Sequence, residues 1–232
     1  MNRPFTSPAL EGKRRVLEQR LASPKCRRAA FIDESYTAPK DDRGDTFYII
    51  ASFVTENDEL EGLAQDLEAR FAWESSGRLF WHSTDAHGGG RDMRVRLEGF
   101  CDYLGEGPSH EALMAVVVAP ILRDDSDGEQ ARRRCLKTAL QLLHDGVDDV
   151  LPADLVVLEE RAGRANVDQH TVTEAVREGL IDRNYPVLAT TPSLDSARGL
   201  WCADAVAYSV ARELSSGDNR YSSRLGDQLR RF

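Results

Sequence analysis

An aspartate, Asp204, lies in an apolar stretch near the C-terminal end of the sequence, where a charged side chain is costly. The stretch reads LWCADAVAYSVA, and at helical spacing the neighbours of Asp204 are Leu200, Ala207 and Tyr208. Burying an unpaired carboxylate on such a face costs several kcal/mol. We therefore expect Asp204 to bind a metal ion, or to be satisfied by an arginine such as Arg198 or by the start of a helix.

Further acids end two apolar runs that are typical of buried strands. Asp33 and Glu34 follow the run AAFI, and Glu159 and Glu160 follow the run LVVL. Ligands of α/β sheets bind beyond the carboxyl ends of the strands, so we expect these acids to meet Asp204 there. Like charges at short range repel, and a divalent cation removes that repulsion. Ligands that are all oxygen favour Mg²⁺ or Mn²⁺.

Such a carboxylate cluster is typical of enzymes that hydrolyse phosphodiester bonds, which hold two metal ions roughly 3.5–4 Å apart. We expect Asp33, Glu159 and Asp204 to be metal ligands and catalytic residues. Glu34 and Glu160 are additional expected ligands, either directly or through water.

Two histidines and a serine complete the candidate site. His82, in the segment RLFWHS, is expected to orient the substrate or shuttle a proton, although a strand histidine bonded to a neighbour fits the pattern as well. His87 precedes three glycines, and we expect it to bind substrate from a mobile loop over the site, a simple turn being the alternative. Ser35, two residues after Asp33, is a further expected substrate contact.

The sequence lacks the motifs of several other kinds of functional site. It contains no phosphate-binding loop, dinucleotide turn, nucleophile elbow or H-E-x-x-H pair. Its four cysteines form no C-x-x-C pair, so we expect free thiols. Trp73, Trp81 and Trp201 are scattered, which indicates core or site-wall residues and not a base-stacking platform.

The length and composition bound the fold and the location. The 232 residues are 41% hydrophobic and 30% charged, which is enough for one sizeable core. No apolar run approaches the roughly 20 residues that span a membrane, and no secretory signal is recognisable. A cytoplasmic protein is the expectation.

The net charge of −9 is unevenly distributed. Residues 1–30 carry eight Lys or Arg and two Glu, which leaves −15 for the rest of the chain. The acidic character of the residues after 30 argues against broad, nonspecific binding of nucleic acid. A basic segment beside an acidic site nevertheless suits a polyanionic partner such as RNA or DNA. The alternative is a solvated helix or a frayed tail.

The apolar patterns predict the α/β class, with a mixed β-sheet flanked by helices. We expect the first two strands to be antiparallel neighbours, and the second half of the chain to alternate strands and helices. Residues 1–24 are expected to form a basic lead-in to a single domain at 25–232, and the tail after Gly217 to be loosely packed. The expected strands are Ala29–Asp33, Thr46–Val54, Leu113–Ala119, Leu155–Glu159 and Val187–Thr190.

Four segments resemble motifs of the bacterial family called domain of unknown function 3800. FIDES at 31–35 is similar to its opening motif, GLWCADAVA at 199–207 to its closing helix, FWHS at 80–83 to its internal strand, and LEER at 158–161 to its acidic strand end. The order of the motifs agrees across roughly residues 28–214. The resemblance implies a ribonuclease H-like fold with a metal-dependent, nuclease-like acid cluster.

Three positions depart from the family pattern. Trp201 replaces a glutamine, Phe80 stands where many relatives carry an acid, and Glu159 stands at an aspartate position. The departures favour a second hypothesis, in which a weak or inactive nuclease-like fold serves as a nucleic-acid- or protein-binding module. A hydrolase of small phosphorylated molecules is a third hypothesis.

Overall fold

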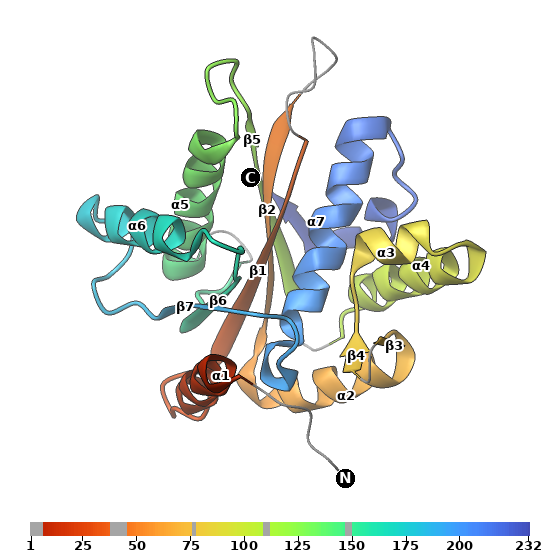
Figure 1. The fold of residues 1–232 in the computed structure, drawn as a ribbon, viewed down its shortest axis with the longest axis horizontal. Helices are drawn as coiled ribbons and strands as arrows, with labels where there is room; N and C mark the ends of the chain where they lie inside the picture. The colour runs from red at the N-terminus through yellow and green to blue at the C-terminus, as the bar shows by residue number, and fades with distance from the viewer. Residues whose placement is uncertain (1–6, 38–45, 76–77, 109–111, 147–149) are drawn as a thin grey trace.

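The central element is a six-stranded mixed sheet with the strand order β7-β6-β1-β2-β5-β8 (Figure 1). The computed structural model describes residues 7–37, 46–75, 78–108, 112–146 and 150–232. A separate antiparallel hairpin consists of β3 and β4. The strands are β1 (Arg28–Tyr36), β2 (Phe47–Glu56), β3 (Trp73–Ser75), β4 (Arg78–Phe80), β5 (Leu113–Pro120), β6 (Leu155–Glu159), β7 (Val187–Thr190) and β8 (Leu229–Arg231).

Helices cover both faces of the sheet, which is the middle one of three layers (Figure 1). α5 and α6 lie on one face, and α7 lies on the other with α3 and α4 beyond it. Short turns η1 (Asn57–Glu59), η2 (Asp195–Ala197), η3 (Ser222–Arg224) and η4 (Gly226–Gln228) connect the elements. The helices are α1 (Pro8–Leu21), α2 (Leu60–Arg70), α3 (Ser83–Gly88), α4 (Arg91–Gly105), α5 (Glu129–Asp145), α6 (Ala165–Arg177) and α7 (Gly199–Ser216).

The predicted α/β class, mixed sheet and flanking helices are confirmed. β1 is antiparallel to β2 and parallel to β6, and β6 is parallel to β7. Each face of the sheet has its own hydrophobic cluster: Phe31 and Phe53 pack under α7, whereas Ile32 and Ile50 pack under α5. Because both faces are covered, the central strands are nearly continuous apolar runs.

Three local expectations need correction or completion. The extended piece ends at Phe80 and α3 begins at Ser83, so His87 lies in a helix and not in a loop. The tail after Gly217 is packed, because Tyr221 and Leu225 are fully buried and β8 joins the sheet. The connection expected between the first two strands falls largely on residues 38–45, outside the described residues.

The basic lead-in contributes to the core. Leu17 on α1 is 1% exposed and belongs to the cluster under α7, so α1 is anchored to the rest of the chain by apolar packing. Among the described residues, no helix has the length and apolar character needed to cross a membrane.

A close approach between Gly199 and Phe31 sets the position of α7 on the sheet. A Cβ added at Gly199 would lie 2.3 Å from the Phe31 ring, which is far inside contact distance. The start of α7 therefore rests directly on β1, and this contact places the rest of the helix, including Asp204, over the strand.

Replacing Gly199 with alanine is expected to lower the free energy of unfolding by about 1–3 kcal/mol, because the helix must move off Phe31. Urea denaturation measures the change. Gly62→Ala is the matched control: Gly62 is a helical glycine of α2 at which an added Cβ would meet open space, so the substitution should be neutral or slightly stabilising. Equal effects of the two substitutions would contradict the close packing.

Candidate active site

Asp33 and Glu159 lie side by side at the carboxyl ends of two parallel strands. The register of β1 and β6 pairs Phe31 with Val157 and Ile32 with Leu158, and the two acids occupy the next positions. Side chains alternate between faces along a strand, so both acids leave the sheet on the face of Phe31 and Val157. That face is covered by α7.

Asp204 approaches the same place from α7. Its Oδ2 accepts hydrogen bonds from the backbone N–H and the hydroxyl of Ser83, both at 2.7 Å. Ser83 is fully buried and is the first residue of α3. The start of α3 therefore satisfies one carboxylate oxygen of Asp204, as one of the sequence-based alternatives expected. Arg198 is engaged elsewhere, by Glu68, Asp195 and a backbone carbonyl.

The pKa values show that the three carboxylates act on one another. Burial, followed by the charges of Asp204 and Glu159, raises the pKa of Asp33 well above its ordinary value. Burial, followed by the charge of Asp204, raises the pKa of Glu159 to about 7. Burial also raises the pKa of Asp204, against the opposing influence of His82 and Ser83. The charged forms are thus destabilised unless a cation compensates.

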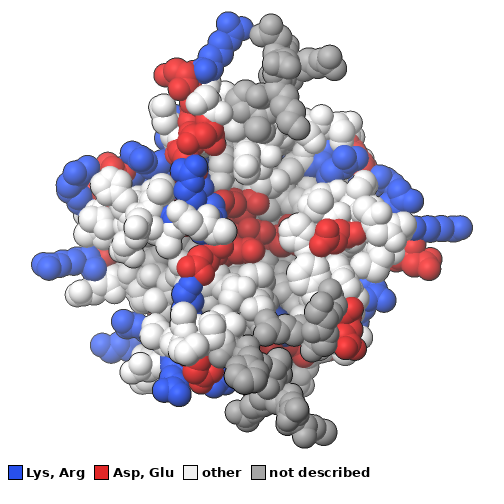
Figure 2. All heavy atoms as spheres, in the orientation of Figure 1, with Lys and Arg blue, Asp and Glu red and all other residues white. Residues whose placement is uncertain are grey.

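Acidic side chains gather at the centre of the face that looks out over β1, β6 and α7 (Figure 2). Asp33, Glu159 and Asp204 are all partly exposed, so solvent reaches the cluster although protein surrounds each group. A cluster that is crowded and still accessible suits a ligand from solution.

His82 lies at the rim of this cluster. Its side chain is 49% exposed, and its Nδ1 lies 3.7 Å from Asp85. A charge on His82 lowers the pKa of both Glu159 and Asp204, which places the ring close to the two carboxylates.

The other two expected substrate contacts have different surroundings. Ser35 lies on β1 two residues after Asp33, on the same face of the sheet, and is partly exposed. His87 contacts the Tyr221 hydroxyl through Nδ1 at 2.9 Å and packs against Tyr208. Burial lowers the pKa of His87. These contacts tie α3 to α7 and the C-terminal tail.

Glu34 points to the opposite face, where arginines surround it. Arg132 donates from Nε to Glu34 at 2.6 Å and bonds Asp168 at 2.7 Å. Arg161 lies 3.5 Å from Glu34 and donates to Asp168. Glu160 forms an ion pair with Lys13 of α1. The two additional expected ligands therefore already have cationic partners, and α1 brings part of the basic segment to the edge of the site.

Two residues near the cluster, Ser83 and Thr190, were given no role from the sequence, and a third, Trp81, was expected as a core or site-wall residue. Ser83 holds Asp204, and the indole N–H of Trp81 faces Asp204 without completing a hydrogen bond of normal geometry. Thr190, 2% exposed, pairs in register with Glu159, and its Oγ1 is buried without a hydrogen-bond partner. Only the FWHS segment carried a sequence signal, and that signal pointed to His82.

The donor set agrees in chemistry with a divalent cation. Asp33, Glu159 and Asp204 offer carboxylate oxygens from three elements, and their mutual repulsion is what a cation relieves. Within the described ranges, no three His, Cys, Asp or Glu side chains are spaced as a finished metal site. The observations that fit a metal are therefore the crowded charges and the buried Thr190 Oγ1, an oxygen without a hydrogen-bond partner.

An open hollow of about 540 Å³ adjoins the cluster on the side of α6. Glu160 and Thr191, which directly follow the paired residues Glu159 and Thr190, both line it. Asp33, Glu159 and Asp204 do not line the hollow, and Glu160 is its link to the cluster along the chain. Its lining residues are Glu160, Arg161, Ala162, Gly163, Ala165, Asn166 and Thr191.

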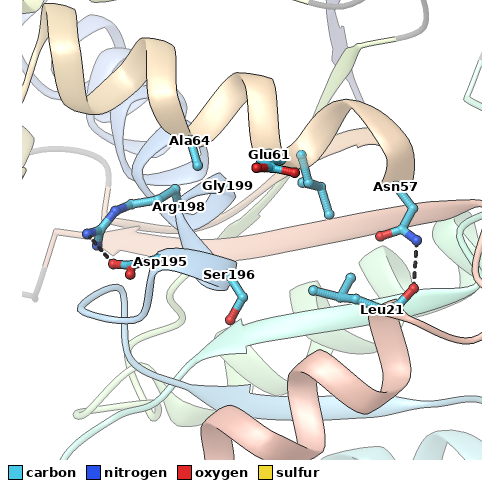
Figure 3. Close-up of a pocket in the computed structure, with 9 residues that line it drawn as sticks. Leu21, Asn57, Glu61, Ala64, Asp195, Ser196, Arg198 and Gly199 are labelled. Carbon is cyan, nitrogen blue, oxygen red and sulfur yellow. Dashed lines mark hydrogen bonds and ion pairs between the residues drawn. The ribbon is translucent and has the colours of Figure 1, made fainter.

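A different cavity, of about 370 Å³, lies between the end of α1, α2 and the start of α7 (Figure 3). Its polar groups are largely engaged with one another: Asn57 donates to the Leu21 carbonyl, and Arg198 bonds Asp195. None of the acids expected from the sequence lines it. The carboxylate cluster, and not this cavity, is the better candidate for chemistry.

In EDTA, the free energy of unfolding is expected to fall by about 2–3 kcal/mol as the pH rises from about 4.5 to 7. Glu159 has an ordinary pKa of 4.5 and a folded pKa of about 7, so the folded protein holds a proton that the unfolded chain has lost. Urea denaturation across this range measures the slope. Glu159→Gln should flatten it, whereas Glu106→Gln, at an exposed position on the end of α4, should not. An unchanged slope in Glu159→Gln would contradict the assignment.

No model of a known protein family matches this chain, and a search of curated proteins returns no match either.

Proposed function

We propose that this protein is a metal-dependent phosphodiester hydrolase, a nuclease that uses Mg²⁺ or Mn²⁺. The observation that carries the proposal is the convergence of Asp33, Glu159 and Asp204 from β1, β6 and α7. The raised pKa values of these acids mark a place where negative charge is crowded. Perturbed carboxylates in an accessible recess are typical of catalytic centres.

Each residue of the cluster has a role in this proposal. Asp33, Glu159 and Asp204 are the metal ligands, and Ser83 fixes the direction of the Asp204 carboxylate. A divalent cation held by these three carboxylates would supply an activated water and stabilise charge on the leaving oxygen. His82 uses Nδ1 toward Asp85, so Nε2 is the nitrogen that gives a proton to the leaving group.

The sheet supports a ribonuclease H-like classification. Three antiparallel strands, β1, β2 and β5, are followed by the parallel strands β6 and β7 on the other side of β1. This order agrees with the fold implied by the FIDES, FWHS, LEER and GLWCADAVA segments.

The substrate in this proposal is nucleic acid. The hollow beside Glu160 and the ion pair of that residue with Lys13 place a cationic group at the edge of the acidic cluster. Glu160 neutralises Lys13 in that pair, so the charge of the polymer would be balanced mainly by the cation that the carboxylates hold.

Cleavage of labelled oligonucleotides tests the proposal. Single- and double-stranded RNA and DNA and an RNA–DNA hybrid are incubated with Mg²⁺, Mn²⁺ or EDTA, beside free nucleotides. We expect cleavage of at least one polymer with metal and none in EDTA. Undiminished cleavage in EDTA excludes the metal mechanism. Binding without turnover in either metal would instead support a binding module, and turnover of nucleotides alone would support a small-molecule hydrolase.

A further inference from the structure

The β3–β4 hairpin and the residues after it present exposed rings beside the candidate site. Phe80 is 36% exposed, and the His82 side chain is 49% exposed. Their rings are nearly parallel, with an interplanar angle of 22° and centroids 6.4 Å apart. The exposed phenylalanine and the exposed histidine aligned with it offer flat ring faces to a planar partner.

Neighbouring aromatic residues hold the Phe80 ring in place. Trp73 packs edge-on against Phe80 at 5.3 Å and lies 5.4 Å from Trp81. Trp81 is 2% exposed and packs edge-on against Phe100 at 4.6 Å. The exposed surface is therefore backed by a packed aromatic wall, and little side-chain freedom remains to be lost on binding.

The same segment also reaches the carboxylates. Ser83, three residues after Phe80, donates two hydrogen bonds to Asp204, and His82 influences the pKa of Asp204 and Glu159. Three extended residues span about 10 Å at most. A ring stacked on Phe80 thus lies within reach of a phosphate at the cluster.

We propose that Phe80 and His82 form a stacking surface for one unpaired base of a single-stranded RNA or DNA substrate, next to the phosphate that is cleaved. The inference rests on the proposed function, since the carboxylates define where that phosphate lies. Bases of an intact duplex are stacked on each other and do not offer a free face, whereas single strands bind aromatic side chains readily.

The charge of the protein favours this mode of binding. The chain has a net charge of −9, and the cluster itself is acidic, so the electrostatic attraction of phosphates is weak around the site. Stacking is independent of the phosphate charge and supplies affinity where electrostatics does not. Phe80 is uncharged, so it adds a ring at this position without adding to the repulsion of phosphates.

Phe80→Ala tests the inference in two separate assays. Binding of a fluorescent single-stranded 12-mer is measured by anisotropy on an Asp204→Asn background, and cleavage is measured with Asp204 intact. We expect Phe80→Ala to weaken binding roughly ten-fold or more, and Phe80→Trp to restore it. A 12-mer with one abasic position at the stacked site should bind both proteins alike. Leu151→Ala, at an exposed residue before the opposite end of β6, is the control and should change nothing.

The outcomes separate the two claims. Cleavage by the parent protein with unchanged binding after Phe80→Ala would overturn the stacking surface and leave the nuclease proposal standing. Loss of binding in Phe80→Ala without cleavage by the parent protein would support stacking and remove the nuclease proposal. Failure of the parent to prefer single strands over duplexes would overturn the stacking surface. A change only in self-association after Phe80→Ala would overturn it in favour of a protein partner.

Discussion

Asp33→Asn and Asp204→Asn are each expected to lower metal-dependent cleavage roughly a thousand-fold or more, because each removes a charge that holds the cation. Asparagine keeps the size of the side chain and an oxygen that accepts a hydrogen bond, so the bond from Glu34 N to Asp33 and those from Ser83 to Asp204 are retained. The measurement is the single-turnover cleavage rate at saturating Mg²⁺ or Mn²⁺.

The same substitutions are expected to stabilise the metal-free protein. Burial and neighbouring charges raise the pKa of Asp33, so its ionised form is costly and a neutral amide removes that cost. In EDTA, the midpoint of thermal unfolding should rise in Asp33→Asn while activity is lost. This combination distinguishes a functional carboxylate from a structural one, whose removal lowers both.

Asp182→Asn is the matched control for these variants. Asp182 is 86% exposed and lies 3.4 Å from His144, away from the cluster. It should leave cleavage and stability close to those of the parent protein. Cleavage that persists in both Asp33→Asn and Asp204→Asn would reject the mechanism, and a loss of stability in both would show that the acids serve the fold.

Arg132→Met is expected to lower the free energy of unfolding by about 3–5 kcal/mol, since it leaves one buried and one half-buried carboxylate without their main cation. The Arg132 side chain is 3% exposed and bonds Glu34 and Asp168. Arg161 also bonds Asp168, but one oxygen of Asp168 is already without a partner. In a chain of this length the midpoint of thermal unfolding should fall by roughly 10 °C.

Arg133→Met, one position along α5, is the matched control. The Arg133 side chain is 42% exposed and lies 3.6 Å from Glu174, so its removal should cost less than about 1 kcal/mol. Adding Glu34→Gln and Asp168→Asn to Arg132→Met should recover part of the loss, because no buried charge then remains unpaired. Equal losses in Arg132→Met and Arg133→Met would show that the ion network contributes little to stability.

The elements that position the candidate site were largely predictable from local pattern. Apolar runs predicted β1 and β6 because strands buried on both faces need them, and the apolar spacing around Asp204 predicted α7. The tail after Gly217 was misjudged because its polar composition hides two buried residues, Tyr221 and Leu225. Their burial depends on α4, which lies far away in the sequence, as well as on α7, which directly precedes them.

The site itself was only partly predictable. Acids at strand ends and on an apolar helix are visible in sequence, and Asp33, Glu159 and Asp204 do influence one another in the structure. Ser83 could not be assigned to Asp204, because 121 residues separate the two. The aromatic surface was missed because the exposed ring belongs to Phe80, and the tryptophans that attract notice in the sequence lie behind it.

The sequence by itself determined which residues are acidic, which runs are apolar and that neighbouring acids on a strand must face opposite ways. Only the tertiary structure decided that Asp33 faces α7 and Glu34 faces Arg132, because the covering of each face depends on helices distant in the chain. The physical reason is that alternation along a strand is local, whereas the partner of each face is chosen by packing. As a result, Asp33 belongs to the cluster of crowded carboxylates, whereas the next residue, Glu34, belongs to an ion network in which arginines neutralise the acids.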